Sequence, residues 1–208
     1  MKRLVYVAIV VAAVSLAQAL IVPVSPSGDG VIGKDRWGYS SWDNSGFSDS
    51  ATPTSVYHWY EYGDGSWRDA FMQVALVTLP DADSITNATL YLYITQLSGS
   101  GCTLYHAADS SSANGSASQQ IGCSELVADI TSGSGWVGYD VTDFIKNDVT
   151  KGYSFAAFKF LHKGYSNVTF GSAETTEYTP YLSVMSAVPE PATLALLAIG
   201  GWVIRRKK

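Results

Sequence analysis

The sequence predicts an all-β protein with a single jelly-roll-like β-sandwich, and three observations indicate this class. Short apolar segments with period-two alternation are separated by turns rich in Gly, Ser, Thr and Asp. No long segment between the two ends of the chain has the 3.6-residue periodicity of a helix. About 170 residues lie between the two terminal segments, which is enough for one domain with a hydrophobic core.

The N-terminal segment, residues 1–19, has the three parts of a cleavable signal peptide. Lys2 and Arg3 precede an apolar run that is too short to span a membrane, and Ala17 and Ala19 form a small-x-small cleavage site. We therefore expect signal peptidase to cut after Ala19, so that the exported chain begins at Leu20.

Residues 20–67 form the aromatic-rich N-terminal part of the predicted module, with an irregular, turn-rich pattern from residue 23 onwards. Aromatic rings stack on sugar faces in many carbohydrate-binding proteins, but they also close hydrophobic cores. Both interpretations stay open for this segment. The candidate saccharide-stacking residues are Trp37, Trp42, Trp59, Tyr60 and Trp67.

Residues 68–186 have the regular pattern of a β-sandwich. Strands are expected over residues 70–79, 85–94, 103–106, 136–141, 154–161, 168–172 and 181–184. Residues 85–94 form the clearest of them, because Leu90, Leu92 and Ile94 share one face and Tyr91 and Tyr93 the other. Two apolar faces predict a central strand. A short helix is expected over residues 143–147, capped by Asp140 or Thr142.

Cys102 and Cys123 are the two cysteines of the chain. In an exported protein they predict a disulfide. Closing a loop of this length would contribute about 3 kcal/mol in the chain-entropy model.

Charge excludes one class of partner. Six of the 13 basic residues and one of the 18 acidic residues lie in the two terminal signals. The rest of the chain therefore has a formal net charge of −10, compared with −5 for the full sequence. Such a chain repels nucleic acid. A neutral polymer, or an acidic polymer bridged by cations, is the expected partner.

No catalytic or metal-binding motif is present. His58, His106 and His162 are isolated in the sequence, and no two of Glu61, Glu125, Glu174 and Glu177 are spaced in a way that predicts a glycosidase pair. No cofactor is predicted. Acidic turns leave a structural calcium ion as an alternative. Their residues are Asp29, Asp43, Asp64, Asp81 and Asp83.

The C-terminal segment, residues 188–208, combines three features in a fixed order. Pro189, Glu190 and Pro191 are followed by an apolar run, residues 192–204, and then by four cations. The cations are Arg205, Arg206, Lys207 and Lys208. Basic residues after an apolar segment stay in the cytoplasm, so the rest of the chain is oriented outward.

This tail resembles the PEP-CTERM sorting signal. The resemblance implies that a membrane protease-transpeptidase, exosortase, cuts near Pro189–Pro191. The apolar run would act as a transient transmembrane helix until the protein passes to the cell surface or extracellular matrix.

A second resemblance extends over about residues 68–185. Its pieces are residues 79–80, 85–92, 136–142, 170–174 and 180–184, and in this order they look like the DNRLRE-type modules. That group consists of extracellular jelly-roll sandwiches related to a carbohydrate-binding module family, and its members are usually non-catalytic.

Together these features predict an exported, exosortase-sorted, non-catalytic protein that binds or organises exopolysaccharide. One alternative is a purely structural or adhesive matrix protein whose aromatic residues belong to the core. The other is a small polysaccharide-cleaving enzyme, which would require Glu61 and Glu174 to face one cleft.

Overall fold

The computed structural model describes residues 17–24, 30–36, 43–48, 54–61, 64–107, 123–173 and 177–187. In β2, β3 and most of β4 only the backbone is described. The strands are β1 (Ala17–Pro23), β2 (Gly30–Arg36), β3 (Asp43–Ser48), β4 (Thr54–Glu61), β5 (Asp64–Ala75), β6 (Ile85–Gly99), β7 (Cys102–Ala107), β8 (Cys123–Ile130), β9 (Gly135–Asp140), β10 (Phe155–His162), β11 (Ser166–Phe170) and β12 (Tyr181–Ala187).

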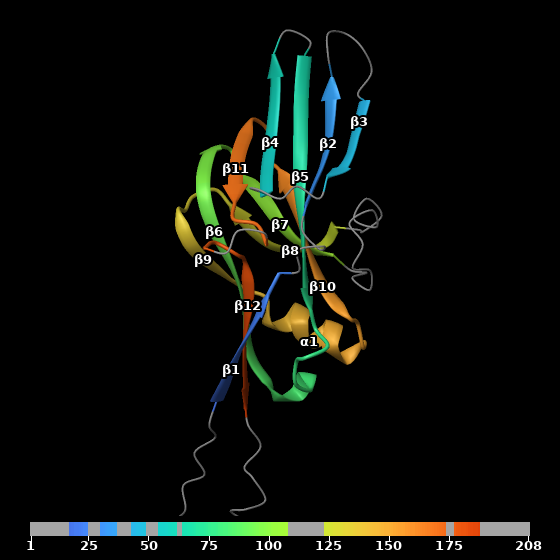
Figure 1. Ribbon diagram of the computed structural model, residues 1–208, viewed down its shortest axis with the longest axis vertical. Helices are drawn as coiled ribbons and strands as arrows, with labels where there is room; N and C mark the ends of the chain where they lie inside the picture. The colour runs from blue at the N-terminus through green and yellow to red at the C-terminus, as the bar shows by residue number, and fades with distance from the viewer. Residues whose placement is uncertain are drawn as a thin grey trace, which may run out of the picture.

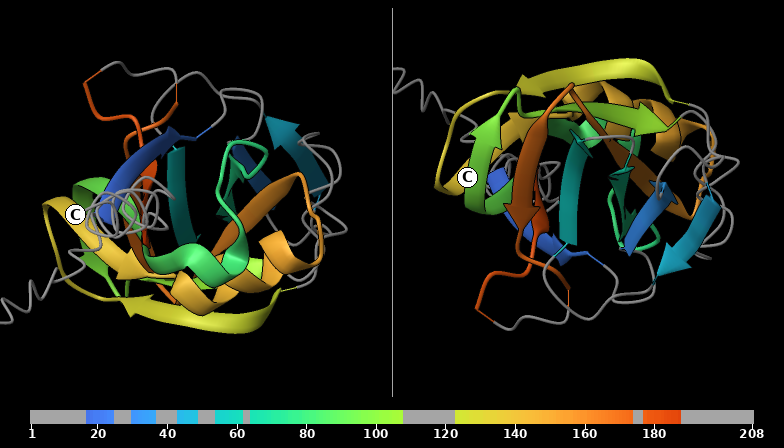
Figure 2. Two further views of the ribbon diagram at one scale, coloured as in Figure 1. Left: turned by 90° about the horizontal axis from the view of Figure 1, so that it is seen from below. Right: turned by 90° about the horizontal axis from the view of Figure 1, so that it is seen from above.

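These strands form an all-β sandwich, as the sequence predicts. They follow the order β1-β12-β6-β11-β4-β5-β10-β7-β8, with β9 on β6, β2 on β5 and β3 on β2. Each of these pairings is antiparallel. The ladder folds round so that two layers enclose one core (Figures 1 and 2).

Strand β6 is central, which confirms the interpretation of its two apolar faces. It pairs with β12, β11 and β9. Leu90, Leu92 and Ile94 are buried, whereas Tyr91 and Tyr93 are half-buried on the other face. The inner side chains belong to the main hydrophobic core.

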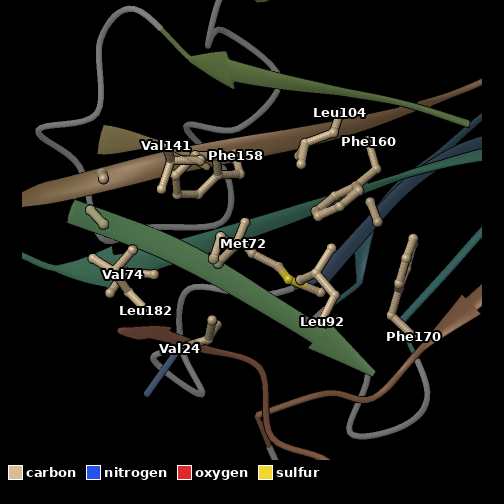
Figure 3. Close-up of a cluster of buried hydrophobic side chains, with 14 of the residues drawn as sticks. Val24, Met72, Val74, Leu92, Leu104, Val141, Phe158, Phe160, Phe170 and Leu182 are labelled. Atoms are coloured by element: carbon tan, nitrogen blue, oxygen red, sulfur yellow. The ribbon is translucent and has the colours of Figure 1, made fainter. Parts of the chain in front are cut away.

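The core is filled by large side chains from both layers. Met72 of β5, Phe158 and Phe160 of β10, Phe170 of β11 and Leu92 of β6 are fully buried and pack in one cluster (Figure 3). The rings of Phe160 and Phe170 lie 4.9 Å apart. Each such side chain contributes about 1.5–3 kcal/mol through burial, so these residues hold the layers together.

One helix, α1 (Thr142–Thr150), follows β9 and is longer than the five residues predicted for it. Its start is fixed by Asp140, whose Oδ1 accepts hydrogen bonds from the Thr142 amide at 2.9 Å and the Thr142 hydroxyl at 2.6 Å. The buried Ile145 packs into the core. The helix contacts β6, β10 and the 3₁₀ turn η1 (Ala82–Ser84).

The N-terminal segment differs from its prediction. Residues 23–68 were expected to be irregular, but they contain β2, β3, β4 and the start of β5. Strands β2 and β4 both pair with β5, which supplies backbone partners that no local pattern reveals. Strand β5 also ends at Ala75, four residues before the predicted end. There the Leu79 amide bonds to the Leu76 carbonyl in a turn that leaves Val77 76% exposed.

The predicted disulfide is wrong, because Cys102 is a free, buried thiol. In the β7–β8 ladder Cys102 lies opposite Ile130, and Cys123 lies opposite Ala107. The two cysteines therefore occupy opposite ends of the hairpin, about five residues or ~17 Å apart along it. A disulfide needs Cα atoms within about 7 Å of each other.

Burial, with smaller effects from Asp69 and Asp129, raises the pKa of the Cys102 thiol to about 12. We therefore expect iodoacetamide at pH 8 to leave Cys102 unmodified in the native protein, because a buried thiol is neither accessible nor ionised. In urea without reductant, Cys102 should be alkylated completely, as measured by peptide mass spectrometry. If the peptide that contains Cys102 is alkylated in urea only after reduction, Cys102 is not a free thiol in the native protein.

Candidate functional site: an aromatic surface on the outer sheet face

Five aromatic rings gather on the outer face of the layer formed by β6, β9 and β12. We call this set the outer-face cluster; its members are Tyr91, Tyr93, Trp136, Tyr178 and Tyr181. The pairing register explains why they meet, because Tyr91 lies opposite Tyr181 and Tyr93 lies opposite Trp136. Side chains at directly opposed positions of antiparallel strands point to the same face.

The rings contact one another in a defined pattern. Tyr91 and Tyr181 are stacked with centroids 5.0 Å apart, and Tyr93 and Tyr178 are stacked at 4.0 Å. Trp136 meets Tyr93 edge-on at 5.3 Å and lies tilted against Tyr181, also at 5.3 Å. The four tyrosines are half-buried by these contacts, whereas Trp136 remains 44% exposed. Trp136 is therefore the ring most available to a ligand.

A glycine makes room for one of these rings. Gly138 lies opposite Tyr91, and a Cβ atom built at Gly138 would meet Tyr91 Cε1 at 3.0 Å and Thr89 Cγ2 at 2.9 Å. Such distances are too short for a real Cβ contact. Any other residue at this position would therefore displace Tyr91 or Thr89.

Polar groups continue this face towards the helix. Thr89 lies opposite Asp140, and its hydroxyl donates to Asn87 Oδ1 at 3.0 Å. Asn87 and Asp140 help to line a pocket of about 480 Å³ beside the start of α1. Hydrogen bonds from the side chain and then the backbone of Thr142 lower the pKa of the Asp140 carboxyl, which therefore stays ionised.

The rings and the pocket form one strip along β6. From Asn87 to Tyr93 the strand advances six residues, which corresponds to about 20 Å at ~3.3 Å per residue. The apolar faces of sugar rings stack on aromatic side chains, and sugar hydroxyls bond to polar rims. A strip of this length can contact several consecutive sugars of an extended chain.

The aromatic residues predicted from the sequence are a different set from the outer-face cluster. Trp67 of β5 is half-buried and lies 5.4 Å from the ring of His162, apart from the outer-face cluster. Trp59 and Tyr60 are placed in β4 by their backbone only. Trp37 and Trp42 lie outside the described residues. The structure therefore does not show that these five side chains meet.

The outer-face cluster was missed for an identifiable reason. The alternation of residues 85–94 placed Tyr91 and Tyr93 on one face. The higher density of tryptophans before residue 68, however, indicated that the candidate site lies in that earlier segment. The available signal was Trp136 at the start of another predicted strand, two residues before a glycine. Only the register between β6 and β9 brings it onto Tyr93.

Other predicted functions fall partly outside the described chain. Glu174 and the sorting motif are not described, so the pairing of Glu61 with Glu174 stays an untested hypothesis. Within the described ranges there is no group of three metal-ligating side chains. The helix found in those ranges is too short and too polar to cross a membrane.

A buried ionic cluster lies between β7, β8 and α1. His106 is 1% exposed, and its Nδ1 lies 2.6 Å from Glu125 Oε2 while its Nε2 lies 2.8 Å from Asp148 Oδ2. Burial opposes protonation, but the hydrogen bonds to Asp148 and Glu125 outweigh it and raise the pKa of His106. Its ring also stacks on Phe144 at 5.0 Å. Because the imidazole is inaccessible, we assign it a structural role.

Two known families match parts of this chain. A family model for carbohydrate-binding module family 96 matches residues 39–186. The chain belongs to carbohydrate-binding module family 96. The model for the PEP-CTERM protein-sorting motif matches residues 187–208. A comparison with curated proteins finds no match.

These matches confirm the predicted combination of a carbohydrate-binding module with a PEP-CTERM signal. The protein is thus a surface-directed carbohydrate-binding protein whose tail is a substrate for exosortase. The more specific DNRLRE-type resemblance stays a prediction.

The His106 cluster makes the stability of this family 96 module depend on pH. A folded-state pKa above the unfolded value of about 6.5 stabilises the fold below that value, and the contribution is lost as pH rises through the folded pKa. We expect the free energy of unfolding, measured by urea titration, to fall as the pH rises above about 6.5, by ~1.4 kcal/mol for each unit by which the folded-state pKa of His106 exceeds that value. In His106→Gln this part of the pH dependence should disappear. An identical pH dependence in the variant would contradict the assignment.

Proposed function

We propose that the protein is a non-catalytic exported module that binds extracellular polysaccharide along the outer-face cluster. On this proposal signal peptidase releases the chain at Ala19, and the apolar run at residues 192–204 anchors it transiently. Exosortase then acts near Pro189–Pro191 and leaves the module at the cell surface or in the matrix. The observation that carries the binding site is the 44% exposed Trp136 among four tyrosines on one sheet face.

The shape of the site favours an internal stretch of polymer over a chain end. The strip runs along β6 and β9 from the pocket at Asn87 and Asp140 to Trp136, and it lies on an open sheet face. A chain lying lengthwise would stack near Trp136 and place hydroxyls near Thr89 and Asp140. Exopolysaccharides offer such internal stretches in many copies.

Charge favours a neutral polymer or an acidic polymer bridged by cations. Among the described residues, the carboxylates near the strip are Asp140, Asp143 at the pocket, and Glu177 beside Tyr178. A polyanion would be repelled by them unless a cation lay between. These carboxylates are negatively charged, as is the exported part of the chain, whose formal net charge is −10.

The chemistry of the strip supports binding without cleavage. A glycosidase needs one carboxylic acid that remains protonated to assist the leaving group. Asp140 is held as a carboxylate by Thr142, and Glu177 Oε1 accepts a hydrogen bond from the exposed Tyr178 hydroxyl at 2.9 Å. The lowered pKa of Asp140 is the opposite of what such an acid requires.

The first test is the change Trp136→Ala. It should weaken binding of the purified protein to exopolysaccharide of the producing organism by about 2 kcal/mol, or roughly thirtyfold, because it removes the exposed ring face. Affinity electrophoresis or calorimetry measures the loss. A circular dichroism melting curve close to that of the parent protein would show that the fold is intact.

Trp67→Ala is the matched control, since it removes the same ring from β5, outside the outer-face cluster. Binding should stay within about twofold of the parent value. If Trp67→Ala abolishes binding and Trp136→Ala does not, the aromatic N-terminal part contains the site. If neither change affects binding, the site lies outside both groups of rings. If the folded parent protein does not bind at all, the structural alternative is favoured.

A further inference from the structure

The first three residues of β1 cover one edge of the last three residues of β12. Ala17 pairs with Ala187, Gln18 with Ser186 and Ala19 with Met185. Figure 1 shows the two strands side by side at one end of the sandwich. In this arrangement the end of β12 has a strand along both edges, with β1 on one side and β6 on the other.

The rest of β1 is anchored independently of these three pairs. Residues 20–23 pair with residues 184–181, and Val22 and Val24 are buried in the main core. The Val24 amide also donates to the Pro180 carbonyl at 2.9 Å. The remainder of the strand therefore stays in place when residues 17–19 are removed.

The expected signal peptidase site lies at the boundary between these two parts. Cleavage after Ala19 removes the three covering residues and leaves residues 20–24 bound. Met185 and Ser186 stay extended, because Met185 pairs with Asn87 and Ser186 pairs with Ile85. The Thr86 hydroxyl also donates to the Met185 carbonyl at 3.1 Å. Cleavage thus uncovers a short, ordered strand edge whose backbone groups lose their partners.

The sorting motif begins two residues after this edge. Proteins that bind extended peptides often add them to a sheet through backbone hydrogen bonds. Pro189 and Pro191 have no N–H group, so the motif itself offers few backbone donors. The nearest ordered backbone donors on its N-terminal side belong to Met185–Ala187 of β12, where successive N–H groups point alternately to the β1 edge and the β6 edge.

Charge places both ends of the precursor on one side of the membrane. Lys2 and Arg3 precede the first apolar run, and four cations follow the second. Both basic groups stay in the cytoplasm, so both apolar segments approach the exported domain from the same side. The pairing of β1 with β12 is compatible with this shared side of approach, because Ala17 and Ala187 lie opposite each other.

We propose that the edge of β12 at Met185–Ala187 is the surface by which the sorting protease binds this chain, and that residues 17–19 cover it until the signal peptide is removed. Removal of the N-terminal signal therefore precedes C-terminal processing and permits it. This inference rests on the proposed processing at Ala19 and near Pro189–Pro191, and it does not depend on which polymer the module binds.

The test compares three full-length chains in the producing organism. The first chain carries a foreign signal peptide that is cut directly before Leu20. The second carries the same signal peptide cut before Ala17, so residues 17–19 are retained, with Ala19→Gln removing the native cleavage site. The third is the second chain with Gln18→Pro, because proline cannot donate to the β12 edge and is poorly tolerated in a paired strand.

Pulse-chase labelling followed by mass spectrometry of both ends measures the rate of C-terminal processing. Retention of residues 17–19 should slow processing by about fivefold or more, because a set of backbone hydrogen bonds must break before the protease can bind. Gln18→Pro should restore the rate of the first chain. Equal rates in the first two chains would overturn the proposal. Slow processing that Gln18→Pro does not restore would also overturn it, because the delay would then not come from strand pairing.

Discussion

The burial of one face of β6 is the constraint on which both the fold and the site depend. Leu90, Leu92 and Ile94 are at most 1% exposed, and they fix which face of the strand meets the core. Because side chains alternate along a strand, Tyr91 and Tyr93 must then face outward. A slip of one residue would exchange the two sets and destroy the core. The aromatic surface is therefore held in place by the same register that closes the sandwich.

The rings of the outer-face cluster differ in their surroundings, and both interpretations of the N-terminal aromatic residues stay predictions. The stacked pairs Tyr91–Tyr181 and Tyr93–Tyr178 cover much of each other, and such pairs add about 0.5–1.5 kcal/mol beyond burial. The tyrosines thus stabilise the pairing of β6 with β12 and the turn before it. Trp136 contacts the same rings but keeps nearly half of its surface free. On the proposed function, neighbouring rings therefore divide structural support and ligand contact between them.

Features set by local alternation could be predicted from the sequence, and features set by distant pairing could not. The faces of β6 followed from five alternating residues, but β2 and β4 depend on β5 for their backbone partners. The disulfide prediction failed because loop length does not reveal the hairpin register that separates Cys102 from Cys123. His106 looked isolated because Glu125 and Asp148 are 19 and 42 residues away in the chain.

The route of the chain connects the proposed binding surface to the sorting motif. Tyr181 belongs to the outer-face cluster and begins β12, the strand that leads to the sorting motif. Pro189 lies eight positions after Tyr181, and a chain of that length spans at most about 29 Å when extended. Transfer of the protein at its motif would therefore place the cluster close to the attachment point. The core of the sandwich lies on the other side of this layer, so the binding face is held rigidly. A polymer bound along β6 would then be held at the surface where the tail delivers the module.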